Sequence, residues 1–224
     1  MKSSKYFLLL IILVFFVSCK QREVDADFGI DFLFKESQPP NDREVNHLPN
    51  KFIGNYINPD STYLIIEDKI VYYKWKTKFY MSFSKFDSIR DSVKIIENRM
   101  YLFNKKNFYE FRKLKDSIEL SYADYDTIFS ISDSNKAKRI KGSIILNTKD
   151  SIYWKIKVLS LNKKSLSIIS LASDADLARL DSFSKIKVQK IDSTKNLIEL
   201  SKTEFKKMLT LKKLGSIQEY KKLE

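Results

Sequence analysis

The chain has 224 residues, of which 41 are Lys or Arg and 28 are Asp or Glu, so its formal net charge is +13. It contains one cysteine, Cys19, and one histidine, His47, which excludes an intramolecular disulfide and leaves a His/Cys zinc site without ligands. Hydrolysis by a Ser–His or Cys–His pair lacks a base in the body of the chain. The four glycines are isolated, so no glycine-rich phosphate loop is present.

The excess of positive charge predicts a partner that carries acidic groups. Without residues 1–18, which include Lys2 and Lys5, the chain keeps 39 basic and 28 acidic residues, or about +11. Such a charge attracts anionic lipid, an acidic glycan or an acidic protein. Nucleic acid is not expected, because only seven of the basic residues are Arg, whose planar fork suits phosphate. The alternative is a Lys-rich composition that only solvates the surface.

The first 19 residues have the pattern of an export signal. Lys2 and Lys5 form a basic start, and residues 7–17 are an unbroken apolar run, as in a secretory signal peptide. This run is shorter than the roughly 20 residues that a membrane-spanning helix needs. A small residue, Ser18, then precedes Cys19.

The segment Phe16-Val17-Ser18-Cys19 resembles the lipobox of bacterial lipoproteins, with Phe16 in place of the usual Leu. The resemblance implies that residues 1–18 are a signal peptide and that Cys19 is the site of lipid (palmitate) attachment. It also implies a chain anchored to the cell membrane outside the cytoplasm, on the periplasmic or surface face of the outer membrane. Acyl chains contribute about 0.8 kcal/mol per buried CH₂, so two or more of them hold a protein stably on a bilayer. The alternative is an ordinary secretion signal with an incidental cysteine.

Residues 19–48 are predicted to form a tether, and residues 49–224 a single β-rich domain with a helical tail. The tether mixes charges of both signs and is interrupted by Pro39 and Pro40. Its apolar cluster, residues 28–34, either packs on the body as a short strand or stays loose near the membrane.

From Phe52 to about Leu171 the pattern is β. In residues 69–80, Val71, Tyr73, Trp75, Thr77 and Phe79 alternate with Tyr72, Lys74, Lys76, Lys78 and Tyr80, which is typical of a half-buried antiparallel strand. The other candidate strands are 62–67, 93–96, 100–103, 108–114, 117–122, 127–132, 140–146, 152–161 and 166–171. Asp-Ser or Asp-Thr pairs at 60, 91, 116, 126 and 150 predict turns made without glycine. The fold class is therefore mainly β, an antiparallel meander that closes into a barrel or curved sheet.

The tail is predicted to add two short helices packed on the sheet. Ser173 with Asp176 and Ser201 with Glu204 have the spacing of capping boxes. They predict helices near 174–182 and 202–213, the second ending at Gly215. Residues 185–191 and 197–200 are predicted strands.

The segment Phe52-Ile53-Gly54-Asn55-Tyr56 is similar to the Gly-x-Trp opening of lipocalin-type barrels, with Tyr56 in place of the Trp. A lipocalin-like fold would imply an apolar ligand held inside the barrel.

Aromatic and acidic side chains supply the candidate sites. Tyr73 with Trp75, and Trp154 with Tyr153, could form a stacking platform for sugars or line a pocket, and otherwise belong to the core. A group of acidic residues could instead supply the carboxylates of a glycosidase or of a Ca²⁺ site. The alternative is that these acidic residues only cap helices and form turns. The acidic candidates are Asp124, Asp126, Asp174, Asp176 and Asp181. No catalytic, cofactor or metal-binding residue is assigned.

These observations favour a non-enzymatic binding module of the cell envelope. The alternatives are a protein–protein role, as an assembly factor or an inhibitor, and then a carboxylate enzyme acting on glycan. A cavity would favour ligand binding, an exposed apolar or basic patch a protein partner, and two carboxylates in one cleft an enzyme.

The lipobox generates a first prediction. Replacing Cys19 by Ser removes the thiol that would carry the lipid, so we expect loss of acylation and of cleavage by the lipoprotein signal peptidase. Labelling with a fatty-acid analogue measures acylation, and the apparent mass of the protein on a gel of the membrane fraction measures cleavage. A mutant that matures and stays membrane-bound like the wild type would show that the N-terminus is an ordinary secretion signal.

Overall fold

The computed structural model describes residues 29–103, 108–163, 165–182 and 186–223. They form one sixteen-stranded, almost entirely antiparallel sheet, with three short α-helices in the described part of the chain. The sheet is strongly curved but does not close into a barrel. The mainly β fold class is confirmed, and of the two expected forms the curved sheet is the one observed.

Three short helices interrupt the strands. Helix α2 (Phe83–Ile89) lies between β5 and β6, and α3 (Asp174–Asp181) and α4 (Lys202–Met208) lie in the tail. The strands are β1 (Asp31–Phe34), β2 (Glu44–Val45), β3 (Gly54–Ile57), β4 (Tyr63–Ile66), β5 (Ile70–Met81), β6 (Val93–Ile96), β7 (Arg99–Leu102), β8 (Phe108–Lys113), β9 (Ile118–Ser130), β10 (Asn135–Ile140), β11 (Ser143–Asp150), β12 (Tyr153–Asn162), β13 (Ser165–Ser170), β14 (Lys187–Lys190), β15 (Lys195–Glu199) and β16 (Ser216–Lys222).

The concave side of the curved sheet holds the first hydrophobic core. Strands β11, β12, β13, β16, β3, β4 and β5 follow one another in the sheet and turn alternate side chains inward, as period-two alternation requires. Tyr56, Leu64, Val71, Leu159 and Leu166 are completely buried there. The segment that resembles a lipocalin opening contributes to this core, because the Tyr56 hydroxyl donates to the carbonyl of Phe52 at 2.8 Å.

A second core lies on the opposite face of β11 and β12. Ile145 and Val158 alternate with the inward residues of these strands and pack under β1, β15, α3 and α4. Phe34 and Phe205 meet edge-to-face here, with ring centroids 6.4 Å apart. The tail therefore packs on the sheet as predicted.

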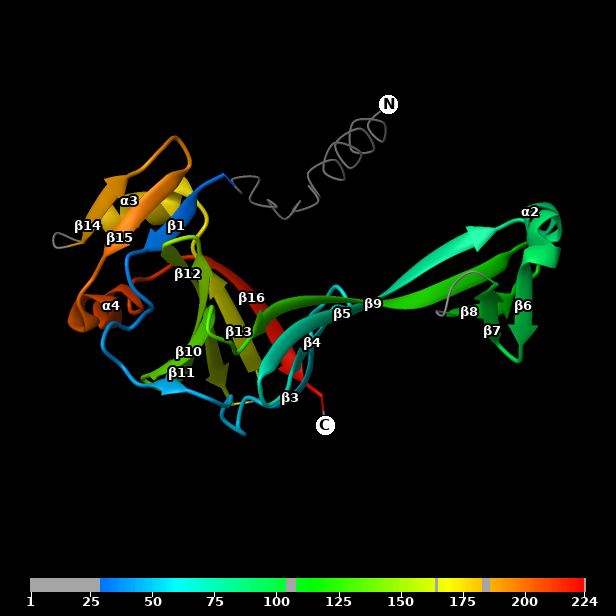
Figure 1. Cartoon of the computed structure of the whole chain (residues 1–224), viewed down its shortest axis with the longest axis horizontal. Coiled ribbons are helices and arrows are strands. Elements are labelled where there is room, and N and C mark those ends of the chain that lie inside the picture. Colours follow the sequence, from blue (N-terminus) through cyan, green and yellow to red (C-terminus); the bar gives the residue numbers. More distant parts are fainter. Residues whose placement is uncertain (1–28, 104–107, 164, 183–185, 224) are drawn as a thin grey trace, which may run out of the picture.

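The third core belongs to a separate lobe. Strands β5 and β9 run beyond the body as a two-stranded ribbon, and β8, β7 and β6 add to their far end. We call residues 76–123 the distal lobe; Figure 1 shows it at one end of an elongated molecule, with the body at the other. Phe86 of α2 packs on Met100, Ile118 and Leu120 on one side of the lobe's sheet.

The predicted tether is largely part of the folded body. Strand β1 pairs in parallel with β15 and contacts β12, and Phe32, Leu33 and Phe34 are buried. The side chain of Asn147 accepts a hydrogen bond from the backbone N–H of Gln38 at 2.5 Å and donates one to its backbone carbonyl at 2.9 Å. The body thus begins near residue 31, not at 49, because partners more than 100 residues away in the chain order this segment.

Several local predictions differ in detail from the structure. Both capping boxes are present, although the second helix ends at Met208, before the expected 213. The predicted turn at Asp126-Thr127 is wrong: these residues lie inside β9, where long pairing with β5 overrides a local turn preference. Asp91-Ser92 does not join two strands either, because these residues lie in a short 3-10 helix, Arg90–Ser92, that continues α2. Helix α2 and strand β16 are not anticipated by the sequence pattern.

The separate cores generate a prediction about stability. Replacing Leu120, which is fully buried in the distal lobe, by Ala should cost roughly 2–4 kcal/mol of local stability, through lost burial and a cavity. Hydrogen exchange by mass spectrometry should show faster exchange in the distal lobe and unchanged protection in β11, β12 and β13. Leu166→Ala, in the concave core, is the matched control and should produce the reverse pattern. Equal loss of protection in both lobes after Leu120→Ala would mean that they unfold as one unit.

Candidate functional site

One face of the distal lobe is covered by α2, and the other, the bare face, is covered by no element in the described part of the chain. Antiparallel registry places charged and polar side chains of successive strands in a row across the bare face. Lys78 of β5 lies opposite Ser121 of β9, Ser121 opposite Glu110 of β8, and Glu110 opposite Arg99 of β7. Residues directly opposite one another share a face of the sheet, so four strands build this surface together.

The bare face is hollowed into an open groove of about 870 Å³. Its lining includes five cationic side chains and three carboxylates, which leaves an excess of two positive charges. The cations are Lys76, Lys78, Arg99, Arg112 and Lys113, and the carboxylates are Glu97, Glu110 and Glu119. The groove therefore suits an acidic ligand and is too polar for an apolar one.

Part of the charge in the groove is already paired. Glu110 forms an ion pair with Lys76 and accepts a hydrogen bond from the Ser121 hydroxyl at 3.2 Å. The hydrogen bond from Lys76 is the main cause that lowers the pKa of Glu110 below its ordinary value. Glu119 lies 3.6 Å from the ammonium of Lys78 and accepts from the Tyr80 hydroxyl at 3.1 Å.

The remaining cations are less committed. Arg99 lies over the ring of Phe108, 4.6 Å from its centroid, and Lys113 lies 5.3 Å from the ring of Phe83. Among the described residues, Arg112 forms no ion pair. Arg99 and Arg112 can therefore offer charge to a ligand without breaking an existing ion pair, whereas Lys113, opposite Ile118 in the ladder, reaches toward α2.

A second hollow of about 440 Å³ adjoins the groove and shares Lys76 and Glu110 with it. Trp75, one of the predicted aromatic candidates, lines this hollow together with Tyr63 and Lys74. Trp75 thus lines a hollow beside the groove, at the point where the ribbon leaves the body.

The other two predicted aromatics lie elsewhere. Tyr73 packs against the concave core, where its hydroxyl donates to Gln218 at 2.9 Å and its ring stacks on Tyr220 with centroids 6.3 Å apart; burial raises the pKa of Tyr73. Trp154 lies against the second core, under the ammonium groups of Lys136 and Lys149. The predicted platform of Tyr73, Trp75 and Trp154 is therefore not assembled as one site.

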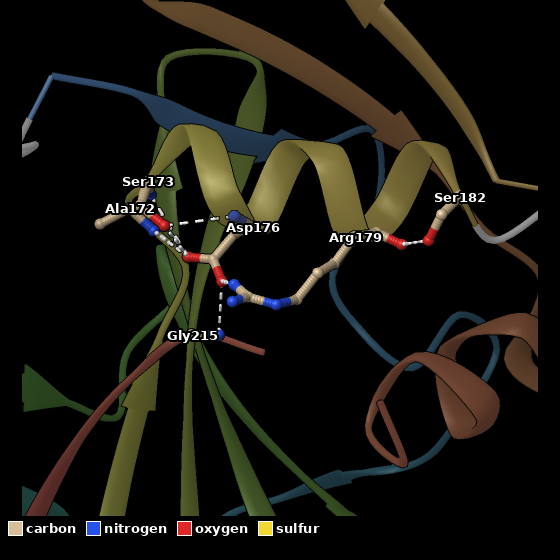
Figure 2. Close-up of polar contacts among 6 residues, drawn as sticks. All are labelled: Ala172, Ser173, Asp176, Arg179, Ser182 and Gly215. Carbon is tan, nitrogen blue, oxygen red and sulfur yellow. Dashed lines mark hydrogen bonds and ion pairs between the residues drawn. The ribbon is translucent and has the colours of Figure 1, made fainter. Parts of the chain in front are cut away.

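The acidic cluster of the tail is structural. Figure 2 shows Asp176 at the start of α3, accepting hydrogen bonds from the backbone N–H groups of Ala172, Ser173 and Gly215. The Ser173 hydroxyl and Arg179 complete its contacts, at 3.0 and 3.5 Å. Asp176 is 1 % exposed, so its carboxylate is used inside the protein, and Asp174 and Asp181 are exposed helix residues.

The other acidic candidates and the histidine lie outside the groove lining. Asp124 and Asp126 are opposite Trp75 and Tyr73 in the ladder, on the face of the ribbon turned away from Lys76. His47 is exposed and lies 2.7 Å from the carboxylate of Asp68.

Sequence reasoning found one strand of the groove and missed the others. The alternation of Lys74, Lys76 and Lys78 in β5 indicated a polar face. Arg99, Glu110 and their neighbours join that face only through strand pairing, and the sequence pattern does not show which strands pair.

No protein-family model, no curated protein and no solved structure matches the chain. In the described part of the chain, no group of three or more His, Cys, Asp or Glu side chains could hold a metal ion, and no helix is long and apolar enough to cross a membrane. Cys19, the predicted lipid-attachment residue, lies outside the described residues.

The role of Asp176 generates a prediction. Replacing it by Ala leaves three partly buried N–H donors without their acceptor and breaks the link between α3 and Gly215, so we expect a loss of about 2–3 kcal/mol in the free energy of unfolding. Urea unfolding measures the change. Asp174→Ala, two residues earlier in the same turn of α3 but exposed, is the control and should change stability by less than about 0.5 kcal/mol. Comparable losses in the two variants would mean that the buried contacts of Asp176 contribute little.

Proposed function

We propose that this chain is a lipid-anchored, non-enzymatic binding protein of the bacterial cell envelope, and that its distal lobe holds an acidic glycan. The observation that carries the proposal is the bare, cation-rich groove on the distal lobe. The lipid anchor rests on the resemblance of residues 16–19 to a lipobox.

The groove offers two kinds of contact that an acidic glycan uses. Arg and Lys side chains form charge-assisted hydrogen bonds with carboxylate or sulfate groups, and Arg112 is available for them. Exposed aromatic rings beside the cations can stack on the apolar faces of sugar rings. Tyr80 and Phe108 are 62 % and 39 % exposed, and both belong to the strands that form the groove.

The shape of the molecule supports the same proposal. The first described residues enter the body at β1, while the distal lobe projects at the far end of the β5–β9 ribbon (Figure 1). An anchor before residue 29 would therefore leave the groove away from the lipid surface, where a polymer of the envelope can reach it.

A carboxylate hydrolase is the second candidate, because Glu110 and Glu119 line one groove and glycosidases use such a pair. A general acid needs a pKa raised toward the working pH, whereas the pKa of Glu110 is lowered. The lowered pKa therefore disfavours Glu110 as the general acid, and the excess of cations in the groove favours binding of an acidic ligand as the first proposal. Release of reducing ends from an acidic glycan, abolished in Glu119→Gln, would establish the hydrolase instead.

The binding proposal predicts charge-dependent affinity. A Lys78→Gln, Arg112→Gln double variant should bind an oligomer of galacturonic acid about tenfold more weakly, since two exposed charges contribute on the order of 1.4 kcal/mol together. Isothermal titration calorimetry measures the affinity, with Lys207→Gln, Lys212→Gln as a variant of equal charge change outside the groove. Glu110→Gln removes a negative charge from the groove and should strengthen binding.

Three outcomes would contradict the proposal. A neutral galactose oligomer could bind as tightly as the acidic one. The control variant could lose as much affinity as the groove variant, which would indicate a response to net charge alone. The acidic oligomer could also fail to bind the wild-type protein at low ionic strength, where screening is weakest.

A further inference from the structure

The free edge of the distal lobe is a separate feature from its groove. Strand β6 stands at one end of the pairing order of the sheet and bonds only to β7 among the described strands. An edge strand has a row of backbone N–H and C=O groups that can pair with another chain, and proteins normally protect it.

The hairpin geometry shows which groups of β6 face outward. Ile96 lies opposite Arg99 across a two-residue turn, and Lys94 lies opposite Tyr101. The N–H of Phe103 donates to the carbonyl of Ser92 at 3.3 Å, so the hydrogen-bonded pairs fall on the even-numbered residues of β6. Hydrogen-bonded and non-bonded pairs alternate in an antiparallel ladder. The N–H and C=O groups of Ile95 and the C=O group of Val93 therefore point to the free edge, while the N–H of Val93 donates to the carbonyl of Arg90.

Exposed apolar side chains accompany these backbone groups. Ile95 is 39 % exposed, Ile96 47 % and Phe103 66 %. Within the strand, only Lys94 carries a charge, and β6 contains no proline and no irregular pairing with β7. This edge thus presents unpaired backbone groups beside exposed apolar side chains. It has little of the protection by charge, proline or bulges that keeps edge strands unpaired.

We propose that β6 accepts an extended, acidic segment of a partner protein as an added antiparallel strand. In such a pair, the partner residue opposite Lys94 lies on the groove side of the sheet, near Arg99 and Tyr101, and an acidic side chain there meets positive charge. The residues opposite Val93 and Ile95 lie on the side of α2 and the lobe's core, where apolar side chains fit. The segment recognised alternates apolar and acidic residues, the usual mode of strand addition.

A second copy of this chain fits the edge less well. Registers that join the outward groups of two β6 strands place Lys94 opposite Lys94, or opposite Ile96 of the other copy. Like charges directly opposite are unfavourable, and a chain of net charge +13 repels its own copies. An acidic partner removes both costs.

The test uses the purified chain with a fluorescein-labelled peptide in which Val and Glu alternate, and with the same peptide carrying Lys for Glu. The Glu peptide should bind and the Lys peptide should not, as followed by anisotropy. Ile95→Pro removes an outward N–H without taking a bond from β7, as prolines on edge strands do, and should weaken binding at least tenfold. Lys190→Pro is the control, because Lys190 has the equivalent outward position on the other edge strand, β14. It should bind like the wild type.

A charge-reversal variant and a hydrogen-exchange measurement separate loss of binding from loss of folding. Lys94→Glu should weaken the Glu peptide and allow the Lys peptide to bind, which a misfolded lobe would not do. Bound Glu peptide should slow amide exchange of Ile95, while the N–H groups of Val93, Lys94 and Ile96 already donate within the lobe. Equal binding by Ile95→Pro and wild type, or equal binding of both peptides, would overturn the proposal. A concentration-dependent dimer that Ile95→Pro abolishes would assign the edge to self-pairing instead.

This inference does not depend on the proposed glycan function. Neither Val93, Lys94 nor Ile95 lines the groove, so Ile95→Pro should leave binding of the galacturonic acid oligomer unchanged. Loss of one activity without the other identifies which of the two proposals fails.

Discussion

The antiparallel pairing of β5 with β9 is the constraint on which the rest of the molecule depends. Its register runs from Ile70 opposite Ser130 to Met81 opposite Ile118, and it joins two hydrophobic cores. At one end Val71 and Phe129 enter the concave core, and at the other Phe79 and Leu120 enter the core of the distal lobe. Any slip by one residue would turn each of these side chains to the opposite face. The irregular step between Val71 and Tyr72 admits one extra residue of β9 and lets the ribbon bend as it leaves the body.

The same register creates the charged surface. Because inward residues of the distal lobe are apolar and covered by α2, their neighbours in sequence must face the other way. Lys76, Lys78 and Glu110 are such neighbours, and nothing in the described chain covers them. Core and groove are therefore two sides of one alternation, and the ion pair of Lys76 with Glu110 keeps part of the charge satisfied while Arg112 remains open to solvent.

The tail closes the body through a few long-range polar contacts. Asp176 ties the start of α3 to Gly215, which precedes the last strand. Gly215 adopts φ +77°, and a side chain there would approach Ile169 to 2.7 Å. A glycine and a buried carboxylate at this point let the chain turn from α4 into β16, which then fills the place between β13 and β3.

Local chemistry in the sequence determined much of this structure. Period-two alternation identified β5, Asp-Ser pairs at 60, 116 and 150 marked three turns between strands, and Ser173 and Ser201 with their acidic partners located both tail helices. Each of these signals acts within a few residues, so each can be recognised without knowing the fold. The lipobox is of the same kind, and it remains a prediction.

Only the tertiary structure decided where these elements meet. Residues 31–34 became a strand because β15, more than 160 residues later, pairs with them, and Asp126-Thr127 stayed extended because β5 pairs alongside. The groove combines residues of β5, β7, β8 and β9, and the free edge of β6 exists because no other described strand pairs there. Strand partners are chosen by packing and by hydrogen bonds between distant segments, and neither leaves a periodic signal in the sequence of one strand.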